Sequence, residues 1–190
     1  MSGLTFELEP FRNEAQEGFR GVAGPYGDTM AYYVKSVRDH QPNATLRAQL
    51  VSEHLPEAHV DGIGMGGQPS PYKATLEVDG ITGKLKYNSY GLTRAARALH
   101  ITYADRTYTY AYTRTLRTDT ELRRRGARIT LTNGRRIRGT GQVRKVTTHG
   151  DTDEVDLAIA LVFEAVATDP LDPTAAPLYG LFRSDTNGDG

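Results

Sequence analysis

The feature that most constrains the fold is an apolar segment near the C-terminus, residues 157–167, which reads LAIALVFEAVA and carries one charged residue, Glu164. Acidic residues precede the segment, alanines recur inside it and Pro170 follows it, which together favour an α-helix. Because the segment is apolar around nearly its whole circumference, it must be buried on all sides rather than laid on a surface. A fully buried strand is the alternative, since short apolar runs fit either element.

Most of the chain before this segment has the patterns of β-strands. Residues 4–8 alternate apolar and polar side chains, residues 30–34 form a short apolar run, and residues 178–182 suggest a last strand. Three hairpins are predicted over residues 74–87, 99–112 and 129–143, with turns at Asp79-Gly80, at residues 104–106 and at Asn133-Gly134. The chain is therefore predicted to be rich in antiparallel β-structure.

Two segments of the N-terminal part break this pattern. Apolar residues recur at a spacing of four between Asn43, a typical helix cap, and Pro56, which predicts an amphipathic helix over residues 44–55. Residues 60–71 hold four glycines within six positions and two prolines, a composition that predicts a linker.

These elements define a fold class and an organisation. A chain of 190 residues can bury roughly 70% of the surface that its unfolded form exposes, so a sizeable core is possible. We expect a mainly β fold of the α+β class, in which antiparallel hairpins form a roll or barrel, with a buried C-terminal helix and one amphipathic N-terminal helix. The expected parts are N-terminal strands and helix (1–59), a glycine/proline linker (60–71), a β-rich domain with the buried helix (72–183) and a flexible tail (184–190), all within one compact domain.

The composition also bears on the compartment. There are no cysteines, which removes disulfides and thiolate chemistry and is compatible with a reducing compartment. The N-terminus has neither the basic nor the apolar region of a signal peptide. The longest apolar run, residues 157–163, is far shorter than the roughly 20 residues that a membrane-spanning helix needs. We expect a cytoplasmic protein with no transmembrane segment, able to associate peripherally with a membrane.

Charge is segregated along the chain although the net formal charge is zero. Residues 114–145 hold eleven basic residues against two acidic ones, a formal charge of +9, whereas residues 147–190 hold nine acidic residues against Arg183, a formal charge of −8. One interpretation is a cationic face for a polyanion such as phospholipid headgroups, because clustered arginines bind phosphate bidentately. The other is complementarity between the two segments, within one chain or between protomers.

The first interpretation makes the chain a non-enzymatic binding protein that contacts an anionic surface, such as phospholipid, through an Arg-rich face of a β-rich domain. The candidate binding residues are Arg123, Arg124, Arg125, Arg128, Arg135, Arg136, Arg138, Arg144 and Lys145. The alternative is a structural or assembly protein in which the basic segment of one protomer docks onto the acidic segment of another. Self-association is the partnership that this alternative implies.

No pattern predicts a catalytic, metal or cofactor site. The five histidines are scattered, and neither a Gly-x-Ser-x-Gly motif nor a suggestive pair of carboxylates is present. Residues 185–190 match only the first half of an EF-hand loop, and residues 62–67 lack the lysine and the helix of a phosphate-binding loop. Pro56 breaks the helical register that would let His54 and His59 converge on a metal.

Three tyrosines, Tyr108, Tyr110 and Tyr112, share one face of a predicted strand between Arg106 and Arg114. Exposed rings beside arginines would suit base stacking, but tyrosines at a period of two more often pack against a core. We therefore expect packing, and we do not expect nucleic acid as a partner.

A succession of antiparallel hairpins followed by an acidic lead-in and the apolar run Asp156-Leu157-Ala158-Ile159-Ala160-Leu161-Val162 resembles the tubby and LURP-one-related family. The resemblance covers residues 72–167 and implies a β-barrel closed around a central hydrophobic helix. It also implies contact with lipid or phosphoinositide through basic residues on the barrel exterior, with no catalytic residues to transfer. Two features depart from the family pattern: the predicted helix over residues 44–55, and the proline-bearing extension after residue 167.

Overall fold

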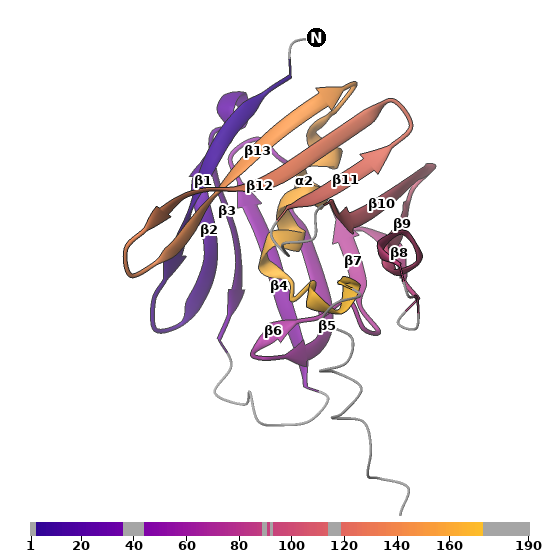
Figure 1. Cartoon of the computed structure of the whole chain (residues 1–190), viewed down its shortest axis with the longest axis horizontal. Coiled ribbons are helices and arrows are strands. Elements are labelled where there is room, and N and C mark those ends of the chain that lie inside the picture. The colour runs from indigo at the N-terminus through magenta and orange to yellow at the C-terminus, as the bar shows by residue number, and fades with distance from the viewer. Residues whose placement is uncertain (1–2, 36–43, 89–90, 92, 114–118, 173–190) are drawn as a thin grey trace, which may run out of the picture.

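The structure is a computed structural model and describes residues 3–35, 44–88, 91, 93–113 and 119–172 (Figure 1). Its strands are β1 (Thr5–Arg12), β2 (Gln16–Val22), β3 (Asp28–Val34), β4 (Thr45–Ser52), β5 (Ala58–Met65), β6 (Gln68–Pro69), β7 (Thr75–Val78), β8 (Ile81–Lys86), β9 (Leu99–Tyr103), β10 (Arg106–Tyr112), β11 (Thr120–Arg124), β12 (Ala127–Ile137) and β13 (Gly141–Gly150). Its helical elements are η1 (Gly24–Tyr26), α1 (Arg94–Arg97), α2 (Glu154–Val162), η2 (Phe163–Ala165) and η3 (Asp169–Leu171).

The strands form one antiparallel sheet that closes into a barrel. The order is β4-β3-β2-β1-β13-β12-β11-β10-β9-β8-β7-β5, and β4 pairs with β5 to complete a ring of 12 strands. The two-residue strand β6 pairs with β5 beside this ring. The expected mainly β fold, with antiparallel strands in a barrel and a helix near the C-terminus, is confirmed. None of the described helices is both long and apolar enough to cross a membrane.

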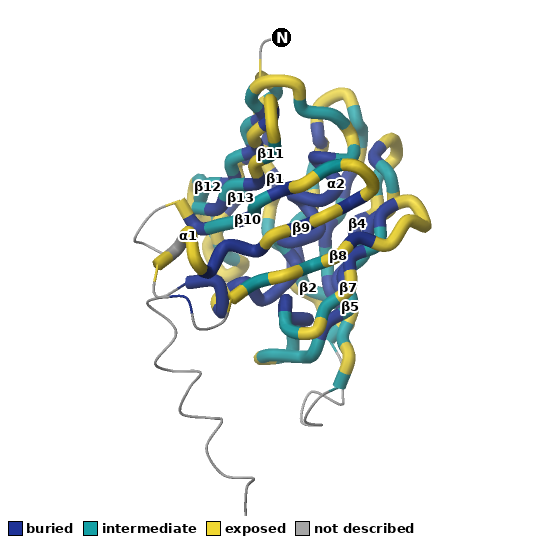
Figure 2. The backbone as a smooth tube through the Cα atoms, turned by 90° about the vertical axis from the view of Figure 1, so that its right-hand side faces the viewer, coloured by how far each residue is buried: buried dark blue, intermediate teal, exposed yellow. Residues whose placement is uncertain are grey.

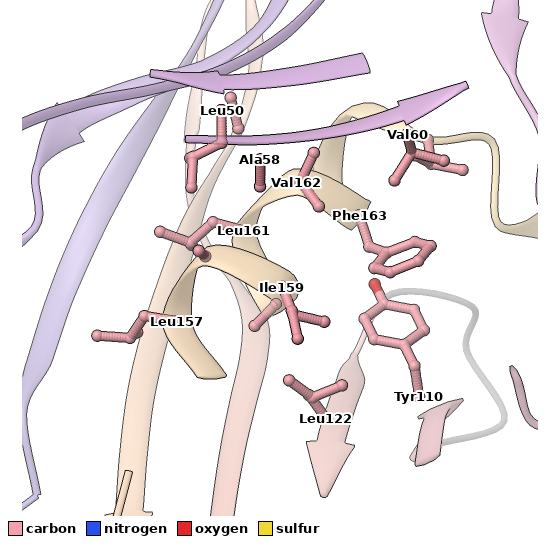
Figure 3. Close-up of a cluster of buried hydrophobic side chains, with 14 of the residues drawn as sticks. Leu50, Ala58, Val60, Tyr110, Leu122, Leu157, Ile159, Leu161, Val162 and Phe163 are labelled. Atoms are coloured by element: carbon pink, nitrogen blue, oxygen red, sulfur yellow. The ribbon is translucent and has the colours of Figure 1, made fainter. Parts of the chain in front are cut away.

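The predicted apolar helix is α2, which lies inside the barrel and continues into η2. Every residue from Leu157 to Phe163 is at most 1% exposed, as the sequence required. In Figure 3 the side chains of Leu50 and Val60 approach the helix from one side, and those of Tyr110 and Leu122 lie near its other side. The ring of Tyr110 stacks at a tilt on that of Phe163, with 5.2 Å between centroids. Burying a large apolar side chain contributes about 1.5–3 kcal/mol, so this helix supplies much of the core.

Two carboxylates enter the core with the helix. Asp156, whose side chain is 2% exposed, completes a capping box with Asp153 at the start of α2. The Arg124 guanidinium donates to both Asp156 oxygens, from Nε and Nη2, each at 2.7 Å. The Tyr108 hydroxyl donates to Oδ1 at 3.0 Å, and Arg106 lies 3.4 Å from the same oxygen. The carboxylate is thus buried with a guanidinium and a hydroxyl as partners, which offsets the cost of removing it from water.

Glu164 is the second buried carboxylate and lies at the other end of the helix, in η2, with its side chain 1% exposed. The Arg144 guanidinium pairs with it from β13, and the hydroxyls of Tyr110 and Thr120 each donate to Oε1 at 3.4 Å. Arginines of the barrel wall therefore hold both ends of the helix.

The amphipathic helix predicted over residues 44–55 is wrong, because this segment forms β4 between β3 and β5. A spacing of four residues is a multiple of two, so Leu46 and Leu50 share one face of a strand as readily as one face of a helix. Ala48 lies between them on that inner face and is fully buried. Pairing on both edges of β4 closes the barrel, and this pairing makes the segment a strand rather than a helix. Asn43, the predicted cap, lies outside the described residues.

The linker predicted over residues 60–71 is also wrong, because the segment holds most of β5 and all of β6. Its glycines serve close packing and a turn. A Cβ on Gly62 would lie 2.0 Å from the Ser70 carbonyl oxygen, and Gly66 turns the chain with a φ of +58°. The sheet continues through this segment from β4 to β7.

The hairpins of residues 74–87 and 99–112 form as predicted, as β7–β8 and β9–β10. The third has a different turn: Asn133-Gly134 lies inside β12, and the chain reverses between Ile137 and Gly141. Asn133 is held in the sheet because its side chain bonds Gln142 at 2.7 Å and Arg144 at 2.6 Å, and the register shifts just after it. Strands β2 and β11 were not predicted, and the strand and tail predicted at residues 178–182 and 184–190 lie outside the described residues.

Removing the Asp156 carboxylate should strongly destabilise the protein. In Asp156→Ala the Arg124 guanidinium loses its bidentate partner, and breaking a buried pair from one side costs about 3–5 kcal/mol. Glu154→Ala is the matched control, since Glu154 is an exposed acid in the same helical turn. This substitution should lower the free energy of unfolding by less than about 1 kcal/mol. Urea unfolding of both variants measures the difference, and equal losses would contradict the assigned role of Asp156.

Alkaline pH should unfold the barrel through its buried tyrosines. Burial raises the pKa of Tyr108 and of Tyr112 to about 12. The nearby carboxylate of Asp156 adds to the rise at Tyr108, and those of Asp169 and Glu164 add to it at Tyr112. The unfolded chain releases these protons near pH 10, so the stability is fully present below pH 10 and is lost as the pH rises towards 12. At pH 11 each of these two phenols should lower the free energy of unfolding by roughly 1.4 kcal/mol. Denaturation series at pH 8 and pH 11 test this, and Tyr112→Phe should reduce the difference.

Candidate anion-binding surface

The nine candidate residues of the basic segment do not form one patch. Two of them point into the barrel: Arg124 and Arg144, whose side chains are 18% and 14% exposed. Three lie on or beside the outer face of β11 and β12: Arg123, Arg125 and Arg128. Three lie at the far end of the β12–β13 hairpin: Arg135, Arg136 and Arg138. Lys145 is exposed on β13 between these two outer groups.

The two inward arginines are committed to the central helix. Arg124 binds Asp156 and also donates to the Asp151 carbonyl at 2.6 Å, and Arg144 binds Glu164 and Asn133. The structure therefore does not bring Arg124 and Arg144 to the exposed surface. Neighbouring positions such as Arg123 and Arg124 differ because successive residues of a strand face opposite sides of the sheet.

The outer arginines of β11 and β12 belong to a longer row across the barrel wall. Strand pairing places six outward-facing residues directly side by side on β13, β12, β11, β10, β9 and β8, and we call them the basic row: His149, Arg128, Arg123, Thr109, His100 and Lys86. With about 4.8 Å between strands, the row is about 24 Å long. Figure 2 shows buried and exposed positions alternating along β9 and buried and intermediate positions alternating along β10, with α2 behind them.

The basic row is only partly neutralised by acids. Glu121 lies 2.8 Å from Arg123 and 3.8 Å from Arg128, so one carboxylate serves both guanidiniums. Among the described residues neither Lys86 nor Lys84, two residues away on the same face of β8, takes part in an ion pair. Exposed ion pairs of this kind are weak, so these side chains can exchange partners with a ligand at little cost.

Four members of the row, Lys86, His100, Thr109 and His149, lie outside residues 114–145, so a count of the charges in that segment misses them. The alternation of lysines with apolar residues around Leu85 did place Lys86 on the outer face. What the sequence could not supply is the register that aligns β8 with β13, because four intervening strands set it.

The hairpin end forms a separate basic surface. Arg136 follows Arg128 by eight residues on β12, or about 26 Å at 3.3 Å per residue. This exceeds the Debye length of about 8 Å at physiological salt, so the two groups act as independent charges.

The three tyrosines of β10 are buried, between 1% and 8% exposed, and their hydroxyls bond Asp156, Glu164 and Thr168. The interpretation that they pack rather than stack on bases is confirmed. No cluster of three or more metal-ligating side chains occurs among the residues that the structure describes. A pocket of about 310 Å³ opens beside the Arg144–Glu164 pair, lined by Phe19, Gln68 and Thr168 among others.

Comparison of the chain with protein-family models, with curated proteins and with solved structures finds no match. The architecture and the positions of the charges are therefore the basis for assigning a function.

Arg123 and Arg124 provide a direct test of the two faces of β11. Arg124→Ala should destabilise the protein by about 3 kcal/mol because it strips a buried carboxylate of its main partner. Arg123→Ala should change stability by less than about 1 kcal/mol, since its side chain is 61% exposed and its ion pair is superficial. Thermal or urea unfolding distinguishes the variants, and a larger loss for Arg123→Ala would mean that the two faces are assigned the wrong way round.

Proposed function

We propose that this chain is a non-enzymatic binding protein that contacts an anionic surface, such as phospholipid, through the basic row on the outer wall of its barrel. The observation that carries the proposal is the alignment of Arg128, Arg123 and Lys86 in one register row. Among the described residues, Glu121 is the one carboxylate that forms ion pairs with this row. Such a row concentrates positive potential along one line of the wall.

The chemistry of the row suits phosphate groups at a surface. Guanidinium groups bind phosphate oxygens in pairs, and the hydroxyl of Thr109, which lies beside Arg123 on the next strand, adds a donor. Because the wall curves, a flat surface meets the middle of the row first, where Arg123 lies opposite Arg128 on the next strand and Arg125 lies in the turn beyond them. The nearby tyrosines are buried, so the row offers charge without stacking rings and favours a lipid headgroup layer over a nucleic acid.

The architecture supports the proposal in general terms. A closed antiparallel barrel with a helix at its C-terminal end is what the resemblance to the tubby and LURP-one-related family implies. Membership of that family, and the peripheral membrane location that goes with it, are part of the proposal.

The alternative in which the acidic C-terminal segment docks onto another protomer has less support. Asp156 and Glu164 are buried and bind arginines of their own chain, and Asp153 binds Arg106 at 2.6 Å. Three acids of the C-terminal segment are thus already paired within one barrel.

Vesicle sedimentation tests the proposal. The protein should bind vesicles containing phosphatidylserine at low salt, should bind neutral phosphatidylcholine vesicles far less, and should be released at high salt. A triple variant with Arg123→Ala, Arg125→Ala and Arg128→Ala should bind about 100-fold more weakly, at about 1 kcal/mol for each basic residue.

The control carries the same change in charge at three exposed positions outside the row: Arg12→Ala, Arg47→Ala and Lys73→Ala. It should bind vesicles within a few fold of the natural chain. Binding that is insensitive to salt, or an equal loss in both triple variants, would rule the proposal out. Preferential binding to single-stranded nucleic acid would replace lipid as the ligand.

A further inference from the structure

A groove of about 760 Å³ runs along the outer surface of β1 to β4, on strands that contribute nothing to the basic row. Its floor includes Met30 and Val51, and Val51 is 45% exposed. Val22, which is 58% exposed, pairs with Asp28 of the groove and extends the apolar surface. Large apolar side chains exposed together in a concave surface are typical of a binding site.

The rim of this groove is acidic. Four carboxylates, those of Glu7, Glu9, Asp28 and Glu53, line it against one cation, Arg20, whose guanidinium lies 5.5 Å from the centre of the Phe11 ring. Over the described ranges of the chain, Glu7, Asp28 and Glu53 form no ion pair. We call this surface the acidic groove, and its chemistry calls for a partner with basic side chains around an apolar one.

The end of the β12–β13 hairpin has that chemistry. It presents Arg135, Arg136 and Arg138 around the half-buried Ile137 and projects beyond the barrel at the left of Figure 1. Neither Arg136 nor Arg138 has an ion-pair partner among the residues that the structure describes. Within one chain, Arg135 already reaches the edge of the acidic groove, where it pairs with Glu9 at 2.7 Å. A hairpin arginine and a groove carboxylate are therefore compatible partners.

We propose that the acidic groove binds the β12–β13 hairpin end of a second copy of this chain, giving a reciprocal dimer. The base of the hairpin is fixed, because β12 pairs with β13, and β13 pairs with β1 as far as Arg144. Of the three hairpin arginines, Arg135 alone has an ion pair with its own groove among the described residues. The groove begins on β1, which adjoins β13, so the hairpin and the groove are neighbours on the surface. A two-fold axis between two copies then brings each hairpin to the groove of the other, which is the self-complementary interface of a closed dimer.

This dimer is independent of the proposed membrane contact. Arg136 and Arg138 lie about 26 Å or more along the chain from Arg128 of the basic row. Its contacts are largely ionic at the rim, so it should form at low salt and dissociate as the salt concentration rises.

Light scattering and sedimentation velocity of the full chain test the proposal. The natural chain should show twice the mass of one chain at low salt and the mass of a single chain at high salt. A hairpin variant with Arg136→Glu and Arg138→Glu should be monomeric at low salt, and so should a groove variant with Asp28→Lys and Glu53→Lys. Mixed in equal amounts, the two variants should form a heterodimer, because each reversed surface then faces its complement.

The control variant carries Glu14→Lys and Glu57→Lys, which reverse two exposed acids outside the groove and should leave the dimer intact. A natural chain that is monomeric at low salt would overturn the proposal and would leave the groove for a basic segment of another protein. A mixture of the two reversed variants that stays monomeric would also overturn it, and assemblies larger than a dimer would exclude the reciprocal arrangement. The monomeric hairpin variant should still bind vesicles. This result separates the test of the dimer from the test of the membrane proposal.

Discussion

The burial of two carboxylates together with an apolar helix is the constraint on which the rest of this structure depends. Asp156 and Glu164 enter the barrel with α2 and are almost fully shielded from water. An ionised carboxylate tolerates such a site only if a cation and further hydrogen bonds accompany it. The wall supplies Arg124 and Tyr108 at one end of the helix and Arg144 and Tyr110 at the other. These pairs set the axial position of the helix, which apolar contacts alone would leave less well defined.

This constraint explains part of the uneven charge along the sequence. Arg124 on β11 and Arg144 on β13, both of the basic segment, meet Asp156 and Glu164 of the acidic segment inside the barrel. The arginines on the alternate face of the same strands are left outside, where they have few acidic partners. One stretch of chain thus supplies arginines to both the interior and the surface, because alternate residues of a strand face opposite sides of the sheet.

The outer charges are then distributed by the geometry of the barrel. Register carries Arg123 and Arg128 into line with Lys86, His100 and His149, although these residues are widely spaced along the chain. The long β12–β13 hairpin carries Arg136 and Arg138 away from that row and beside a surface where carboxylates dominate. The molecule therefore presents two separate basic surfaces and one acidic groove, and a net charge of zero conceals all three.

The sequence by itself determined the apolar helix, the two hairpins with clear turns, and the mainly β class, because each depends on local periodicity and turn chemistry. It did not determine β4, since the spacing of Leu46 and Leu50 fits a helix and a strand equally and only pairing with β3 and β5 decides. It named Arg123 and Arg124 as equivalent candidates, yet one faces solvent and the other a buried carboxylate. Only the tertiary structure decided which arginines remain outside and which residues they join, because the partners of a strand are set by closure of the whole ring and not by its own residues.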